Sequence, residues 1–105
     1  MPLYQMLSKM TERGRGRVRH NPDRILEVNR EVEERGMRVL AQYALMGRFD
    51  FATILEAQDD AGMHRLAIAL GARDIIETET MPAFRVEDFI EGMRAELAQM
   101  ELAEE

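Results

Sequence analysis

The sequence contains no cysteine, only three prolines and few aromatic residues. Without cysteine, the chain can form neither disulfide bonds nor thiolate metal sites. No apolar run approaches the roughly 20 residues needed to cross a bilayer. The N-terminal MPLYQMLSKM also lacks the long apolar segment of a secretory signal. We therefore expect a cytoplasmic protein with no membrane partner.

Other absences narrow the possible chemistry. The two histidines, His20 and His64, are far apart in the chain and show no metal-ligand spacing, so we predict no bound metal and no cofactor. No Ser-His-Asp or Cys-His set can be assembled, and GRGRV at residues 14–18 is too short for a GxGxxG phosphate loop. His64 is either an acid–base residue or a solvent-facing helix residue.

The composition is that of one folded domain, with 46% hydrophobic and 32% charged residues among 105. The net charge of −6 is unevenly spread, because residues 1–20 hold five basic residues against Glu12 alone. An acidic chain without aromatic residues among its basic ones argues against nucleic acid as a partner. The basic run is a solvated loop, a partner for the acidic C-terminal segment of a neighbour, or an anion site using Arg13 and Arg15.

Hydrophobic periodicity predicts alternating strands and helices. The expected strands are 3–8, two within 38–57, and the charged edge strand 75–80; the expected helices are 22–36, 58–71 and one from 86. Residues 9–20 are predicted to be a polar loop with a possible helical turn, and Pro82 to break the chain. This order predicts an α+β, ferredoxin-like βαββαβ fold, a four-stranded antiparallel sheet with two helices on one face plus a C-terminal helix.

Such a sheet leaves one apolar face bare, and a second copy of the chain is the usual cover. We therefore predict a homodimer or higher homo-oligomer. Residues 1–85 form the expected domain, and 86–105 an amphipathic helix packed on the same domain or on a neighbouring subunit. Met6, Met63 and Met93 are expected to fill the core.

The stretch RVLAQYALMGRFDFATILEA, residues 38–57, predicts a hairpin folded at Gly47. A two-residue loop, Gly47-Arg48, would use the positive φ that glycine tolerates. It pairs Leu45 with Asp50, Tyr43 with Ala52, Ala41 with Ile54, and Val39 with Glu56 on one face. The other face is expected to lie under the helices and holds Leu40, Gln42, Ala44, Phe51, Thr53 and Leu55.

The hairpin supplies most candidate site residues. Asp50 could act as a general base or bind a ligand donor, with Tyr43 orienting it and His64 as a further catalytic candidate. Gln42, Thr53 and Glu56 are candidate ligand-binding residues. The competing interpretation is structural, since an aspartate beside a glycine commonly accepts hydrogen bonds from its own turn.

Four segments together resemble GYD-domain proteins over about residues 3 to 89: MLSKMTERG, NPDRILEVNREVEERG, VLAQYALMGRFDFATILEAQDD and LGARDIIETETMPAF. The Gly-x-Tyr-Asp signature of that family falls on residues 47–50, where Phe49 replaces the tyrosine and removes its hydroxyl. The resemblance implies a ferredoxin-like fold of the dimeric α/β-barrel type, and it implies no established activity.

We therefore expect a small-molecule-binding or interaction module that associates with itself and takes a small or anionic ligand. The alternative is a cofactor-free oxygenase or isomerase of the dimeric α/β-barrel type using Asp50 and Tyr43. That alternative rests on fold analogy, which is a poor guide to reaction.

Overall fold

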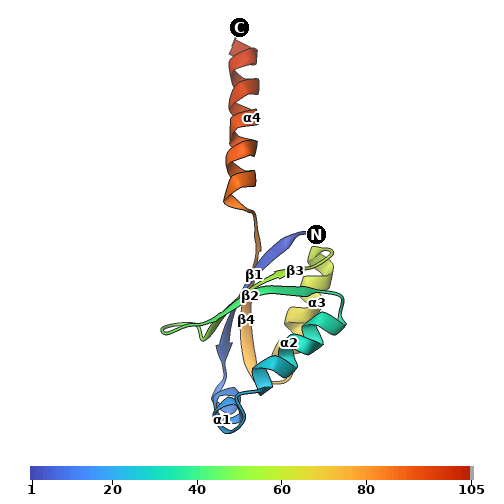
Figure 1. Ribbon diagram of the computed structural model, residues 1–105, viewed down its shortest axis with the longest axis vertical. Helices are drawn as coiled ribbons and strands as arrows, with labels where there is room; N and C mark the ends of the chain where they lie inside the picture. The colour runs from blue at the N-terminus through green and yellow to red at the C-terminus, as the bar shows by residue number, and fades with distance from the viewer. Residues whose placement is uncertain (105) are drawn as a thin grey trace.

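The computed structural model describes residues 1–104 and has an α+β fold with four strands and four helices in that range (Figure 1). In chain order the elements are β1 (Leu3–Met10), α1 (Glu12–His20), α2 (Arg24–Glu34), β2 (Arg38–Ala44), β3 (Phe51–Glu56), α3 (Asp60–Gly71), β4 (Ile76–Ala83) and α4 (Val86–Glu104). The predicted order of strands and main helices is confirmed. The first helix, α1, was predicted as a loop.

The four strands form one antiparallel sheet in the order β2-β3-β1-β4. β1 is central, and its Met6 lies between Thr53 of β3 and Thr80 of β4. The prediction that 75–80 forms a charged edge strand is confirmed, since β4 has one neighbour. The expected break at Pro82 is wrong, because β4 continues to Ala83 with Pro82 opposite Tyr4. On an edge strand, proline can occupy a position whose N–H would point away from the sheet.

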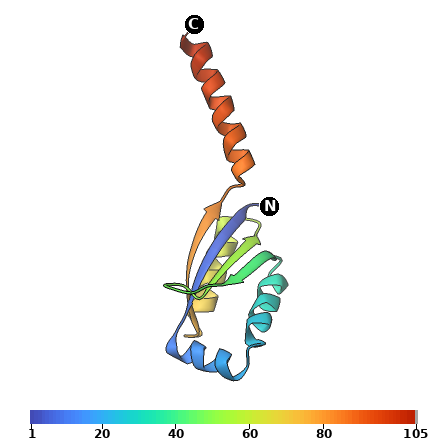
Figure 2. The ribbon, with the colours of Figure 1, turned by 60° about the vertical axis from the view of Figure 1, so that its left-hand side comes forward.

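Helices α2 and α3 lie on the same side of the sheet, and the hydrophobic core lies between them and the sheet (Figures 1 and 2). Alternate residues of the central strands face this core, as strand geometry requires. The buried core residues are Tyr4, Met6, Val32, Met37, Leu55, Ala57, Met63, Leu66 and Leu70. Met6 and Met63 confirm the prediction for the core methionines, whereas Met93 is half exposed on α4 and does not.

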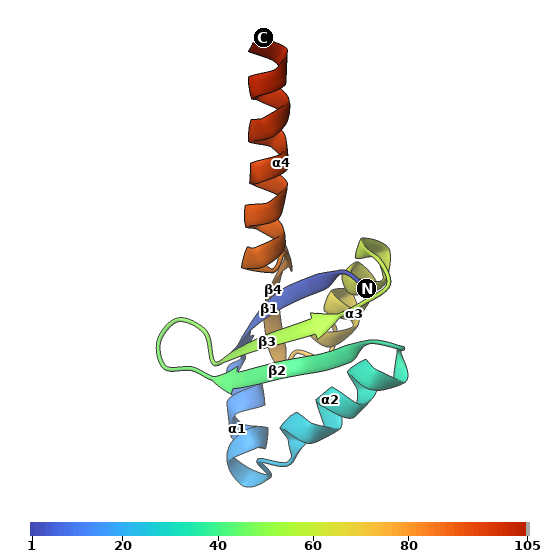
Figure 3. The ribbon, with the colours of Figure 1, turned by 45° about the horizontal axis from the view of Figure 1, so that its top comes forward.

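The hairpin register is confirmed from Ala41 to Leu45. Gly47 has φ +114°, as the turn requires, and the loop projects beyond the sheet (Figure 3). The predicted register fails before Ala41, because a bulge at Leu40 places Val39 opposite Leu55 instead of opposite Glu56. Val39 therefore packs against the core, and Leu40 is 40% exposed, so the two residues exchange the faces expected for them.

Helix α1 begins where Thr11 accepts a hydrogen bond from the N–H of Gly14 at 3.0 Å. A Cβ atom on Gly14 would lie 2.1 Å from the carbonyl oxygen of Ile75, so this close packing requires glycine. The N–H of Asn21 donates to Arg17 O at 2.9 Å and ends α1, and α2 begins at Arg24, two residues later than predicted.

Helix α4 extends away from the sheet, which gives the chain a length of 65 Å (Figures 1 and 3). None of the residues 86–104 is buried. Of the two alternatives expected for 86–105, packing of the helix on its own domain is therefore not seen for residues 86–104. Glu105 lies outside the described residues. Packing on a neighbouring subunit stays a prediction.

Candidate functional site

A cavity of about 230 Å³ lies on the helical side of the sheet. Helices α1 and α2 supply part of its wall, and alternate residues of the four strands supply its floor. The walls are mainly apolar, with Val18, Ile25, Val28, Val39, Phe51 and Ile76 among them. The cavity thus lies on the face predicted for Gln42 and Thr53, not on the face predicted for Tyr43, Asp50 and Glu56. The cavity arises on the helical side because the helices do not fill the space above β1 and β3.

Three polar side chains on this wall form a closed network. Asn29 donates to the amide oxygen of Gln42 at 2.7 Å, and Gln42 donates back to Asn29 at 3.1 Å. Gln42 also donates to the hydroxyl of Thr53 at 3.0 Å. The predicted pairing of Gln42 with Thr53 is confirmed, and their role in ligand binding stays a prediction. The network joins α2 to two strands while satisfying polar groups at the cavity wall.

Two ion pairs lie along the cavity wall. Arg24 contacts Glu27 at 3.1 Å, and the guanidinium of Arg73 makes two hydrogen bonds to the carboxylate of Glu31. Those hydrogen bonds hold the pKa of Glu31 below its usual value and raise the pKa of Arg73. Arg17 also lines the cavity, and it forms no ion pair with any of the residues 1–104.

Asp50 has a different hydrogen-bond partner from either interpretation of the sequence. Its carboxylate accepts from the N–H of Met10 at 2.7 Å, and its own N–H donates to Ser8 O at 2.8 Å. Both partners belong to β1, so Asp50 joins the hairpin to the central strand rather than closing its own turn. Tyr43 is 63% exposed on the open face, and no hydrogen bond connects it to Asp50 within the part of the chain that is described.

The remaining predicted residues lie outside the cavity wall. His64 is exposed on α3, and Glu56 pairs with Arg38 and Leu3 in the sheet. Phe49 stacks under the guanidinium of Arg48, 5.3 Å from the ring centre. Their proposed roles stay predictions.

The two arginines expected to form an anion site are separated by their contacts. Arg15 donates to Met10 O at 2.8 Å. Arg13 lines a shallow surface depression together with Arg17, His20 and Arg24. Residues 1–104 contain no cluster of three or more histidine, aspartate or glutamate side chains suited to a metal ion.

Two partly buried polar contacts were not predicted from the sequence. The hydroxyl of Tyr4 donates to Asp60 at 2.5 Å, and this hydrogen bond raises the pKa of Tyr4 to about 12. Asn29 was the other omission. It follows Ile25 and Val28 on the apolar side of α2, and a polar residue within an apolar stripe signals a buried partner.

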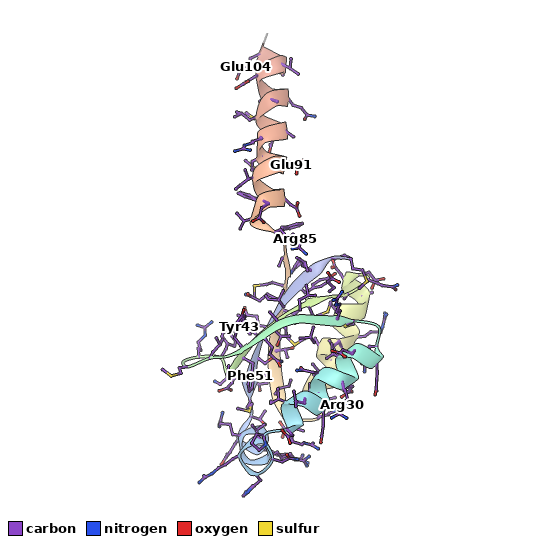
Figure 4. The ribbon with its side chains drawn as sticks, in the orientation of Figure 1. Arg30, Tyr43, Phe51, Arg85, Glu91 and Glu104 are labelled. Atoms are coloured by element: carbon purple, nitrogen blue, oxygen red, sulfur yellow. The ribbon has the colours of Figure 1, made fainter. Side chains whose placement is uncertain are left out.

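Two apolar surfaces have no cover. The first, called the open sheet face, has the apolar residues Leu3, Leu7, Ala41, Tyr43, Ala52, Ile54, Met81 and Ala83, none of which is buried, and the polar residues Gln5, Glu56, Glu77 and Glu79 share that face. The second, called the α4 stripe, consists of Val86, Phe89, Ile90, Met93, Leu97 and Met100, which are 41% to 65% exposed. Figure 4 shows the side chains of α4 projecting with no other part of the chain against them. In residues 1–104, no helix is both long and apolar enough to cross a membrane.

Comparisons with known proteins identify the family. A protein of Thermus thermophilus named "Glutamine synthetase and cystathionine beta-lyase binding protein" is 40% identical over 95 residues, which cover 90% of this chain and 100% of the relative. The crystal structure of TTHA0845, also from Thermus thermophilus, matches this chain with a TM-score of 0.50 and 18% sequence identity. The match covers 81% of this chain and 95% of that one, and it shows similarity of fold alone. The family model described as GYD domain matches residues 4–93. The resemblance inferred from the sequence is thereby confirmed, and the chain belongs to the GYD domain family.

Proposed function

We propose that the protein is a small homo-oligomeric interaction module that binds metabolic enzymes. The observation that carries this proposal is the α4 stripe, which presents large apolar side chains on a helix that touches nothing else. Exposed apolar surfaces of this kind mark protein interaction sites. The name of the Thermus relative supports the same conclusion, since that protein is named for binding glutamine synthetase and cystathionine beta-lyase.

The binding surface we assign to the enzyme partner is α4. Its 19 residues span about 28 Å, and the apolar stripe is flanked by acidic side chains including Glu87, Asp88 and Glu91. The partner should therefore offer an apolar groove with basic residues at its rim. The compartment we propose is the cytoplasm, as expected from the sequence.

Binding can be measured by biolayer interferometry with the full chain and the purified glutamine synthetase and cystathionine beta-lyase of the same organism. Leu97→Glu places a charge in the stripe and should weaken binding by about tenfold or more. Ala95→Glu introduces the same charge on the opposite side of α4 and should leave affinity unchanged. If neither enzyme binds, or if the two variants bind alike, α4 is not the enzyme-binding surface.

Self-association is proposed to occur through the open sheet face. This face is the one side of the sheet that α2 and α3 leave uncovered, and Ile54 lies on it in the interior strand β3. Light scattering should show a dimer or larger assembly, Ile54→Glu should dissociate it, and Ile54→Val should preserve it. A monomeric wild-type chain at micromolar concentration would contradict this proposal.

We also propose that the domain is of the ferredoxin-like, dimeric α/β-barrel type. The strand order supports this, because the connection through α2 carries the chain from β1 to β2, and β3 then returns between them. No observation favours the oxygenase or isomerase alternative, since the Asp50 carboxylate is engaged with the N–H of Met10. The proteins matched above are not named for such activities either.

A further inference from the structure

The cavity between the helices and the sheet is large for the interior of so small a domain. Protein interiors contain few voids larger than a water molecule, and an apolar cavity of about 150 Å³ accommodates a benzene ring. The cavity here measures about 230 Å³, which is room for one ring and a few further carbon atoms. Its lining extends to the surface at Arg17 and Glu27, both exposed, so a ligand has a route inward.

The interior of the cavity favours an apolar body. The polar groups of Asn29, Gln42 and Thr53 on its wall already hydrogen-bond to one another. A ligand lying against them need not supply hydrogen-bonding partners of its own. The surrounding aliphatic and aromatic side chains would gain contact with carbon atoms.

The charges at the α1–α2 end favour a single negative charge. Glu27 and Glu31 are matched by Arg24 and Arg73, which leaves Arg17 as the excess positive charge on the wall. Arg17 and Arg24 also line the adjoining surface depression, so the apolar cavity and the basic surface meet at these two side chains. One carboxylate matches the one excess guanidinium, whereas a phosphate dianion would leave one negative charge unmatched.

We propose that this cavity binds a small amphipathic monocarboxylic acid. The apolar body, one ring or a short alkyl chain, lies against Val28 and Phe51, and the carboxylate lies at the α1–α2 end with Arg17. This site is separate from the α4 stripe and the open sheet face. A negative result for the cavity would therefore leave the proposed enzyme binding unaffected, and the reverse also holds.

The test uses the full chain and isothermal titration calorimetry with octanoate and 3-phenylpropanoate as probes. Both carboxylates should bind, acetate should not, and 3-phenylpropanamide should bind at least about tenfold more weakly than its acid. Val28→Phe places an aromatic ring in the space proposed for the apolar body of the ligand and should weaken binding by at least about tenfold. Arg17→Gln should weaken binding of the acids by about tenfold, whereas Arg19→Gln, a matched change on α1 outside the cavity wall, should not.

Three experimental outcomes would contradict the proposed carboxylate site. Failure of both acids to bind at about 10 mM overturns the proposal. Unchanged affinity in folded Val28→Phe places the ligand elsewhere and overturns it as well. If Val28→Phe does not fold, as circular dichroism would show, the Arg17→Gln and Arg19→Gln pair decides, and equal affinities reject the carboxylate site.

Discussion

Two glycines in α1 allow a matched test of how this helix packs. The same substitution, glycine to alanine, should have opposite effects at Gly14 and Gly16. At Gly16 an added Cβ meets nothing within 4 Å, so alanine contributes only its higher helix propensity. We expect Gly16→Ala to stabilise the fold by about 0.5–1 kcal/mol, or to raise Tm by about 3–6 °C.

At Gly14 the new Cβ would lie 2.1 Å from Ile75 O, against a shortest tolerable distance of 3.0 Å, so the helix must move by the difference of 0.9 Å. That movement disturbs two hydrogen bonds made by Thr11. Its N–H donates to Ile75 O at 2.9 Å, and its hydroxyl donates to Asp74 O at 2.8 Å. With about 1 kcal/mol lost for each of the two bonds and up to about 1 kcal/mol gained from propensity, the net loss is about 1–2 kcal/mol.

Urea unfolding followed by circular dichroism measures both effects, and one protein concentration is used because the proposed self-association would add to stability. The propensity gain is common to both variants, so the expected difference between them is the two lost hydrogen bonds, about 2 kcal/mol. If both variants are stabilised equally, the close contact between α1 and Ile75 does not exist. Because α1 carries Arg17 and Val18 to the cavity, Gly14→Ala should also weaken ligand binding there.

Two further predictions concern buried polar contacts. The hydrogen bond to Asp60 raises the pKa of Tyr4 to about 12 from 10.0, so the stability that it contributes is complete below pH 10 and is lost as pH rises toward 12. The Tyr43→Phe variant keeps Tyr4 as its one tyrosine, and its ultraviolet absorbance should show tyrosinate forming near pH 12. Adding Asp60→Asn to this variant should move the midpoint of that titration toward 10. A midpoint that Asp60→Asn leaves unchanged would contradict the contact. Asp50→Ala should destabilise by about 1–2 kcal/mol because it leaves the N–H of Met10 unpaired, whereas Asp50→Asn, which keeps an acceptor oxygen, should cost less. Equal unfolding free energies for both Asp50 variants and wild type in urea would show that Asp50 does not anchor the hairpin.

Local patterns were enough to predict most of the fold. The alternation along the hairpin and Gly47 at its turn determined the register from Ala41 to Leu45. The bulge could not be predicted, because Val39 and Leu40 are both apolar and either could face the core. Helix α1 was missed because two glycines in nine residues lower helix propensity, and the reason for Gly14 is a contact with Ile75, distant in sequence.

The candidate site was predicted less well than the fold, for a different reason. Gln42 and Thr53 were identified correctly as neighbours because they oppose each other across one hairpin. A cavity, in contrast, is the space that side chains leave unfilled, and its volume depends on how α1 and α2 lie on the sheet. The partner of Asp50 was also invisible in the sequence, because Met10 is 40 positions away.

The bulge at Leu40 has a consequence for how copies of the chain can meet. An edge strand presents unpaired N–H and C=O groups to which a foreign strand can add. β2 is one edge, and the bulge interrupts the regular spacing of those groups there. β4 is the other edge, where Pro82 lacks an N–H and Glu77 and Glu79 repel another copy of the same strand. Neither edge is suited to extending the sheet into a continuous filament, so the self-association proposed above would use the open sheet face, where an assembly can close at a finite size.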